Sequence, residues 1–381
     1  MLDMTPPELN DQYYMAYALG LAKKGLWTTD PNPRVGCVIV QEGEIVGEGW
    51  HQVAGEPHAE IYALQMAKEK AKDATCYVTL EPCCHQGRTP PCTDALIKAG
   101  LSRVVVAMMD PNPLVSRKGI EQISKAGIMV NTGMLSHDAE QLNQGYLMRM
   151  RHKRPYIRSK LGMSLDGRTA MASGESKWIT SQDARRDVQC LRARSSAIMT
   201  GAGTVLADDP QMTVREAELP CELEADKKPS IKQPLRVVID THLSTPAEAR
   251  MLTLPGETVI FTASDSTSAK VILEKAGARV IHLPNREREV DLAAACQLLA
   301  EEYEVNELLM ETGATLSGAM LRAGLIDEMK IYMAPILMGN KTRGLFDLPN
   351  IESLEQHVPL DIVDIRAVGR DWRITAKPIY A

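Results

Sequence analysis

The sequence has 381 residues, of which 44% are hydrophobic and 24% charged, a size and composition that predict about two globular domains. Its 43 basic and 49 acidic residues give a net charge of −6, and only 4% of residues are aromatic, which argues against a general nucleic-acid binder. No apolar run is long enough to cross a membrane and no secretory pattern opens the chain, so the eight cysteines predict reduced thiols and a cytoplasmic location.

Strands and helices alternate through the first part of the chain. Some segments repeat apolar residues at helical spacing, and two β-rich segments flank a turn at Glu42-Gly43. We predict helices at 11–25, 58–72, 91–99 and 117–126, and strands at 34–40, 44–50, 75–80, 104–108 and 128–132. The alternation predicts an α/β layered domain.

A basic run at 149–155 (RMRHKRP) separates this part from a second α/β pattern. We interpret the run as a solvated connector, with nucleic-acid contact as the alternative, and predict domains at 1–150 and 151–381. The polar segment 216–234 predicts a surface loop. The second part predicts strands at 156–162, 196–200, 235–239, 258–262, 279–282 and 307–310, helices at 181–193, 267–276, 290–302 and 315–323, and strand-rich ends at 328–334 and 360–378.

The motif that carries chemistry is His58-Ala59-Glu60, followed by Pro82-Cys83 and then by Cys92. One imidazole and two thiolates form the ligand set of a zinc ion with an open position, and such an ion lowers the pKa of its bound water to about 7. Glu60 is not needed as a ligand. We therefore predict His58, Cys83 and Cys92 as metal ligands, and Glu60 as the catalytic group that moves protons while an amino group is removed from a heterocycle by hydrolysis.

The two cysteines are separated by eight residues, whereas the usual deaminase pattern has two between them. Cys84 or His85 could therefore replace one ligand, either could close a four-ligand structural site, or no metal could bind. A closed four-ligand site would leave Glu60 without a role. The first rival hypothesis is therefore a zinc-stabilised binding module without catalysis. A second rival is a nucleic-acid deaminase with a non-catalytic second domain.

Local chemistry in the second part is less specific. The segment 200–204 contains Gly-x-Gly after a predicted strand, but Leu206 stands where a third glycine would complete a dinucleotide fingerprint. The segment 310–318 runs from a strand into a helix, so its backbone amides could bind a pyrophosphate, or it is a tight turn. Asp208-Asp209 with Asp166 could bind a metal, although we favour loop structure with one carboxylate that polarises the reacting group.

The segments HAE, LEPCCHQGRTPPC and KLGMSLDGRTAMASGESKWIT occur in this order. With them the chain resembles, over nearly its full length, the family of bifunctional riboflavin-biosynthesis deaminase/reductases. The resemblance implies a cytidine-deaminase-like three-layer domain followed by a dihydrofolate-reductase-like domain. It also implies zinc, NADPH and a homodimer or larger assembly. The implied partner is a phosphorylated pyrimidine, 2,5-diamino-6-ribosylamino-4(3H)-pyrimidinone 5′-phosphate, with neither nucleic acid nor membrane involved.

The resemblance also implies individual site residues. These include the same zinc ligands and the same catalytic residue, Glu60, that the motif predicts. In the deaminase half, the implied substrate contacts are Asn32, His51, His85 and Arg88; taken singly, Asn32 is more often a turn residue and His51 an ordinary histidine. In the reductase half, the implied NADPH contacts are Gly162, Trp178, Thr204, Asp208, Gly313, Ala314, Thr315, Leu316, Ser317 and Gly318. The implied substrate contacts there are Ser176, Arg192, Met212, Arg215 and Glu311, with both arginines on the sugar phosphate.

Overall fold

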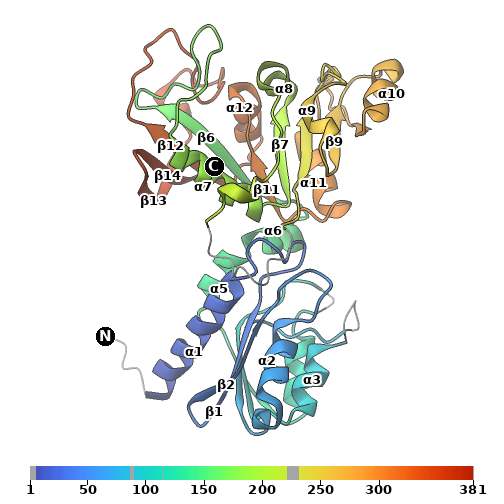
Figure 1. The fold of residues 1–381 in the computed structure, drawn as a ribbon, viewed down its shortest axis with the longest axis vertical. Helices are drawn as coiled ribbons and strands as arrows, with labels where there is room; N and C mark the ends of the chain where they lie inside the picture. Colours follow the sequence, from blue (N-terminus) through green and yellow to red (C-terminus); the bar gives the residue numbers. More distant parts are fainter. Residues whose placement is uncertain (1–5, 86–89, 114, 221–230, 381) are drawn as a thin grey trace. The chain divides into compact units, whose positions relative to one another are not determined.

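The structure is a computed structural model that describes residues 6–85, 90–113, 115–220 and 231–380 (Figure 1). The chain forms two compact units, one ending at His152 and the other beginning at Lys153. Both are α/β, as the sequence predicts. No helix in the described part of the chain is long and apolar enough to cross a membrane.

The first unit is built on a five-stranded sheet in the order β2-β1-β3-β4-β5. Strand β1 pairs antiparallel with β2 and β3, while β3, β4 and β5 are parallel. The strands are β1 (Gly36–Gln41), β2 (Glu44–Trp50), β3 (Thr75–Leu80), β4 (Arg103–Met108) and β5 (Met129–Thr132). The helices are α1 (Pro6–Lys23), α2 (Ala59–Ala67), a 3-10 turn (Lys68–Ala71), α3 (Cys92–Lys98), α4 (Lys118–Lys125), α5 (Ser136–Leu142) and α6 (Gln144–His152).

Alternate strand residues pack on opposite faces of this sheet. Cys37 and Ile39 join one apolar core with α2, α3 and α4, whereas Val38 and Val40 join another with α1, α5 and α6. Figure 1 shows α2 and α3 on one face and α1 and α5 on the other. The unit is therefore a three-layer α/β/α sandwich, as the sequence predicts.

Two glycines of β2 let α2 lie directly on the sheet. A Cβ on Gly47 would stand 2.2 Å from the carbonyl oxygen of Ala63, and one on Gly49 would stand 2.4 Å from that of Ala59. Because a side chain cannot occupy that space, the close approach depends on glycine. It fixes the first turn of α2, which follows His58.

The second unit has a nine-stranded sheet in the order β10-β9-β8-β7-β11-β6-β12-β14-β13. The strands from β10 to β12 run parallel, and β14 and β13 add an antiparallel hairpin at one edge. The strands are β6 (Tyr156–Ser164), β7 (Ala197–Gly201), β8 (Leu235–Ile239), β9 (Thr258–Thr262), β10 (Ala278–His282), β11 (Glu307–Met310), β12 (Glu328–Ala334), β13 (Leu360–Val368) and β14 (Asp371–Pro378).

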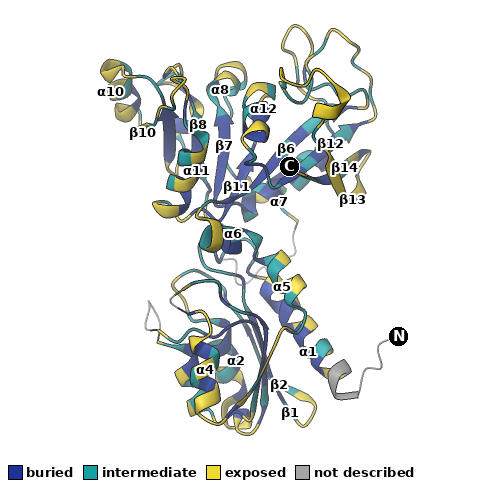
Figure 2. Ribbon diagram, turned by 180° about the vertical axis from the view of Figure 1, so that it is seen from behind, coloured by how far each residue is buried: buried dark blue, intermediate teal, exposed yellow. Residues whose placement is uncertain are grey.

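Helices cover this sheet on both faces, and two apolar cores lie beneath them. The helices are α7 (Gln182–Arg194), α8 (Ala202–Asp208), α9 (Arg250–Thr253), α10 (Thr267–Lys275), α11 (Leu292–Glu301) and α12 (Ala314–Arg322), with 3-10 turns at Glu216–Glu218 and Leu354–Gln356. Figure 2 shows the central strands buried and the edge strand β13 exposed. In open α/β sheets, ligands bind beyond the carboxyl ends of the strands. We therefore expect the second site at the carboxyl ends of the central parallel strands.

The amino ends of the central strands are held by buried charges. Arg158 on β6 is 2% exposed and pairs with Glu307 on β11 and with Glu328 on β12, the latter at 2.6 Å. Arg194 also binds Glu307, at 2.9 Å. These ion pairs lock three adjacent strands at one end and leave the carboxyl ends free of that network.

Most predicted elements are confirmed within a few residues, but the connector at 149–155 is wrong in its first half. Arg149, Arg151 and His152 form the last turn of α6, whose buried residues are Gly145, Tyr146 and Leu147. Cations favour the carboxyl end of a helix, which explains the basic run better than a linker does. The sequence also missed α5, α8 and α9. Of the predicted loop at 216–234, Glu216–Glu218 form a 3-10 turn and residues 221–230 lie outside the described part.

We predict that Gly49→Ala destabilises the protein by about 1–3 kcal/mol, because the new methyl group forces α2 away from β2. Urea denaturation of the full-length protein measures the change. Gly20→Ala is the matched control, since that helical glycine has open space around its Cβ, and it should gain up to about 1 kcal/mol. Equal stability of the two variants would contradict the close-packing argument.

Candidate functional site

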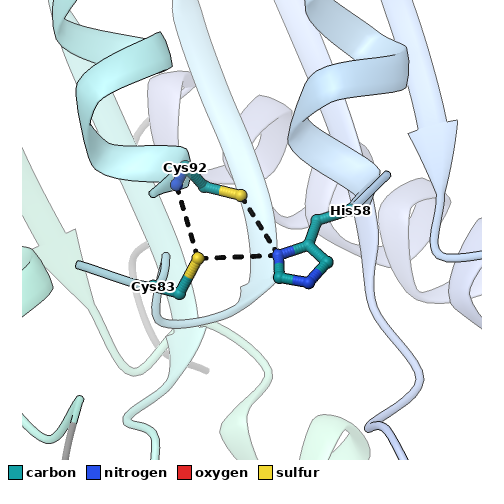
Figure 3. Close-up of side chains that lie close together, drawn as sticks. All are labelled: His58, Cys83 and Cys92. Atoms are coloured by element: carbon teal, nitrogen blue, oxygen red, sulfur yellow. Dashed lines mark hydrogen bonds between the residues drawn. The ribbon is translucent and has the colours of Figure 1, made fainter. Parts of the chain in front are cut away.

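Three predicted ligands meet at the ends of three elements in the first unit. His58 is the N-cap of α2, Cys83 follows β3, and Cys92 is the first residue of α3. The Nδ1 atom of His58 lies 3.3 Å from Sγ of Cys92 and 3.5 Å from Sγ of Cys83. Figure 3 shows the three side chains pointing toward one another. Their donor atoms all lie within 4.8 Å of one another, and no other such group of His, Cys, Asp or Glu occurs among the described residues.

This donor set fits a zinc ion. Bonds of about 2.3 Å to sulfur and about 2.0 Å to nitrogen give tetrahedral edges of about 3.5 Å between nitrogen and sulfur, close to the distances present here. Cys84 is half-exposed and His85 exposed, and neither belongs to the group. The described residues therefore offer three ligands and leave a fourth position open.

Electrostatics prepares one of the thiols as a ligand. A hydrogen bond from the Cys92 side chain lowers the pKa of Cys83 below its ordinary value, and His58 adds to the effect. The backbone N–H of Cys92 also donates to Sγ of Cys83, at 3.3 Å. Because the thiolate is the form that binds metal, Cys83 is ready to bind at neutral pH.

Glu60 lies in the first turn of α2 and is only 3% exposed. Burial raises the pKa of its carboxyl group above the ordinary value, and a hydrogen bond with Cys92 partly offsets this. Its carboxylate is not among the clustered donor atoms. A buried, protonatable carboxyl group beside the ligands can act as a general acid and base.

The structure brings two predicted substrate contacts together beside His58. Nδ2 of Asn32 donates to Nε2 of His51 at 3.0 Å, and Nδ1 of His51 donates to the carbonyl oxygen of Pro57 at 3.1 Å. The rings of His51 and His58 meet edge to face at 5.4 Å. Burial lowers the pKa of His51 to about 4, so this imidazole is neutral and has both nitrogens engaged. Arg88 lies outside the described residues.

Sequence reasoning missed Glu81, which is 3% exposed just before Pro82-Cys83. Its carboxylate accepts hydrogen bonds from the backbone N–H groups of Asp110, Arg117, Gly119 and Ile120, at 3.1–3.4 Å. These bonds tie the loop after β4 and the first turn of α4 to the segment that carries Cys83. The sequence signals are an acidic residue directly after the apolar strand β3 and its place in the segment LEPCCHQGRTPPC.

A second cluster lies at the carboxyl end of β11, where residues of β6 and α7 meet the residue that follows the strand. Glu311 follows β11 and binds Arg192 through two bonds of 2.6 and 3.0 Å, and Lys160 Nζ lies 3.4 Å away. Burial alone would raise the pKa of Glu311, but Arg192 and Lys160 lower it to about 2. Glu311 is therefore ionised. Lys160 is a second residue that sequence reasoning missed, because β6 was interpreted only as a strand.

The predicted cofactor segment begins at Gly313, the N-cap of α12, where no side chain caps the helix. Gly313 and Thr315 are exposed, and a Cβ on Gly313 would lie 3.9 Å from Oγ1 of Thr204, which brings α8 and α12 together. Uncapped amides at this helix start fit a pyrophosphate.

Gly318 differs from the exposed residues of this segment. A Cβ there would stand 2.0 Å from the carbonyl oxygen of Asp347, so this glycine packs against a loop. Ser317 is fully buried, and its hydroxyl pairs with that of Thr312 at 2.7 Å. Leu316 faces Gly201, at 3.5 Å from a Cβ built there. Direct contact with a cofactor is therefore better supported for Gly313 and Thr315.

The remaining predicted residues of the second unit have the following surroundings. Trp178 is 69% exposed with Arg185 stacked 4.5 Å from its ring centre, and the adjacent Lys177 binds Asp208 at 3.2 Å. Ser176 and Gly162 are half-buried, and Met212 is buried. Arg215 binds Glu218 at 2.6 Å.

A metal site formed by Asp166, Asp208 and Asp209 is not found among the described residues. Asp166 accepts backbone hydrogen bonds from Met338 and Gly339, and Asp209 accepts one from Arg250 at 2.9 Å. The loop interpretation explains these two carboxylates.

Comparison with known proteins assigns a family to each half of the chain. Residues 9–108 match the cytidine and deoxycytidylate deaminase zinc-binding region, and residues 155–374 match the RibD C-terminal domain. The riboflavin biosynthesis protein RibD of Escherichia coli K12 is 52% identical over 365 residues, which cover 95% of this chain and 98% of that protein. The RibD protein of Haemophilus influenzae is 46% identical over 371 residues, which cover 97% of this chain and 97% of that protein.

Solved structures agree over nearly the full length. A structure of Acinetobacter baumannii RibD matches with a TM-score of 0.89 and 43% identity, covering 98% of this chain and all of that one. A diaminohydroxyphosphoribosylaminopyrimidine deaminase/5-amino-6-(5-phosphoribosylamino)uracil reductase from Thermotoga maritima matches with a TM-score of 0.85 and 29% identity, with the same coverage.

We predict that Cys92→Ser loses most of its zinc on dialysis against a weak chelator, whereas Cys84→Ser retains the wild-type content. The two variants remove neighbouring thiols of one segment, so each controls for the other. Metal analysis of the purified full-length protein measures the outcome. Zinc loss in Cys84→Ser with retention in Cys92→Ser would exchange their roles.

Proposed function

Because the chain belongs to the RibD family of bifunctional riboflavin-biosynthesis enzymes, we propose that its two residue clusters are the deaminase and reductase sites. The cytidine-deaminase-like half binds zinc and the dihydrofolate-reductase-like half uses NADPH. The three-donor cluster of His58, Cys83 and Cys92 carries the proposal for the first site. We assign the deaminase to residues 1–150 and the reductase to residues 151–381, an assignment supported by the division of the chain after His152.

The proposed substrate is the 2,5-diamino-6-ribosylamino-pyrimidinone 5′-phosphate, supported by the name of the Thermotoga relative. In the first step, water replaces the 2-amino group and ammonia leaves. In the second step, the ribosyl group accepts a hydride and a proton and becomes ribityl. Matches to both halves of the chain speak against a nucleic-acid deaminase with a non-catalytic second domain.

In the deaminase, His58, Cys83 and Cys92 would hold the zinc. When bound, zinc activates water by lowering its pKa to about 7. Glu60 would take one proton from the attacking water and pass it to the ring nitrogen next to the reacting carbon. It would then take the second proton, from the hydroxyl group left on that carbon, and give it to the departing amine, so that ammonia leaves and a carbonyl group remains. Asn32, held by His51, is positioned to recognise the pyrimidine, and His85 and Arg88 complete the proposed substrate contacts.

In the reductase, Gly162, Trp178, Thr204, Asp208 and the segment from Gly313 to Gly318 form the proposed cofactor site. NADPH supplies the hydride when bound. Glu311 is ionised and held by Arg192 and Lys160, so it can fix the hydroxyl groups of the sugar as an acceptor. Arg215 carries the cation for the 5′-phosphate, and Ser176 and Met212 complete the proposed substrate site.

We also propose a homodimer or larger assembly formed through the edge strand β13. Its residues Leu360, Ile362, Val363 and Ile365 are 44–57% exposed, and an unpaired edge with apolar side chains is suited to pairing with another copy. A cytoplasmic location is supported by the thiols, since Cys37 and Cys76 lie 3.4 Å apart as unbonded sulfurs.

The function is tested by incubating the zinc-loaded protein with the diaminopyrimidine ribotide and NADPH, and following ammonia and NADPH absorbance together. We expect ammonia release followed by NADPH oxidation, in equal amounts. A zinc chelator should abolish both signals, and addition of the deaminated ribotide should restore NADPH oxidation alone. Undiminished ammonia release in the zinc-free protein would contradict the proposed role of the metal.

We predict that Glu60→Gln lowers the deamination rate by about 10²–10⁴-fold, because the amide cannot carry protons. Zinc content and reduction of the deaminated ribotide should stay at wild-type levels. Arg215→Ala is the reciprocal variant, with impaired reduction and normal deamination. Equal damage to both steps in either variant would indicate a folding defect and remove the assignment.

A further inference from the structure

Arg215 already binds an anion of this chain. Its Nε and Nη2 atoms donate to the two carboxylate oxygens of Glu218, at 2.6 and 3.1 Å. Arg215 is the N-cap of the 3-10 turn Glu216–Glu218, so the loop folds its own carboxylate back onto the guanidinium. This two-pronged arrangement is the one a phosphate group takes on arginine.

The helix α7 brings further positive charge to the same place. Arg192 of α7 donates from Nη1 to the carbonyl oxygen of Thr213 at 2.8 Å, and Gln189 of α7 accepts the backbone N–H of Arg215 at 2.9 Å. The segment with Arg215 is therefore fastened to the helix that carries Arg192. The hydrogen bond from Arg215 lowers the pKa of Glu218, and the charges of Arg215, Arg192 and Arg185 lower it further.

The two arginines assigned to the sugar phosphate are not equivalent. The guanidinium group of Arg192 donates from Nε and Nη2 to Glu311 and from Nη1 to a backbone carbonyl. All three of its nitrogen atoms therefore already have partners within the protein. Arg215 is 44% exposed at its side chain, and Glu218 is 36% exposed. An exposed ion pair contributes little stability and exchanges readily with a stronger anion.

We propose that Glu218 occupies the anion site of the reductase when substrate is absent, and that the substrate's 5′-phosphate displaces its carboxylate from Arg215. This inference rests on the proposed reductase function. A phosphate dianion has more charge and more acceptor oxygens than a carboxylate, so it wins the exchange, whereas an uncharged sugar cannot. Glu218 thereby sets the affinity of the site and its preference for phosphorylated substrates.

The experiment compares Glu218→Gln with wild type in the zinc-loaded, full-length protein. Glu216→Gln is the matched control, because it removes the same charge from the same turn at an exposed residue outside the Arg215 pair. Reduction is measured with the deaminated ribotide and with the same compound lacking its phosphate, and inhibition is measured with inorganic phosphate. Direct binding of inorganic phosphate is measured by calorimetry.

We expect Glu218→Gln to lower the KM for the ribotide and the inhibition constant of inorganic phosphate by about three- to fivefold, with kcat unchanged. Neither Glu216→Gln nor the phosphate-free compound should show the gain. An unchanged or higher KM in Glu218→Gln, or an equal gain with the phosphate-free compound, would overturn the proposal. If the wild-type protein fails to reduce the ribotide, the reductase assignment falls, while calorimetry still decides whether Glu218 competes with phosphate.

Discussion

The deaminase half depends on the backbone that holds Cys83. His58, Cys83 and Cys92 come from three separate segments, and none of their side chains alone fixes the distance between them. Glu81 supplies the constraint, because its buried carboxylate accepts four backbone N–H groups, two from the loop after β4 and two from the first turn of α4. A carboxylate with so many donors is costly to move. The position of the candidate ligand Cys83 is thus set by a residue that does not belong to the donor cluster.

The same half limits movement on the opposite side of the site. Gly49 lets α2 reach β2, which places His58 and Glu60 at the start of a helix that cannot slide outward without losing packing. His51 has both ring nitrogens engaged and holds the amide of Asn32. The proposed ligand, proton carrier and substrate contact are thus each held by buried neighbours, which suits a reaction that requires a preorganised environment.

The sequence predicted most helices and strands in their order along the chain. This was possible because β-branched runs mark strands, and N-terminal prolines or capping residues mark helices, and both signals are local. It also predicted the cluster of His58, Cys83 and Cys92, since the ligand types and the HAE spacing are local too. It could not find Glu81 or Lys160, because their partners lie far away in sequence and only the folded chain brings them together. The prediction of a connector at the basic run before Lys153 was wrong for a related reason. The run belongs to helix α6, which is held in place by the burial of Tyr146 and Leu147, and that burial is a tertiary effect.

The second half handles charge in a different way from the first. The chain carries a net charge of −6, so a phosphorylated substrate approaches a molecule of its own sign. Local positive charge from arginines can overcome this repulsion. Pairing Arg192 with Glu311 keeps that acceptor fixed, and pairing Arg215 with an exposed carboxylate keeps the second cation in place until a stronger anion arrives. On the proposed assignment, the reductase site therefore combines one buried ion pair, which would orient the sugar, with one exposed and exchangeable pair, which would admit the phosphate.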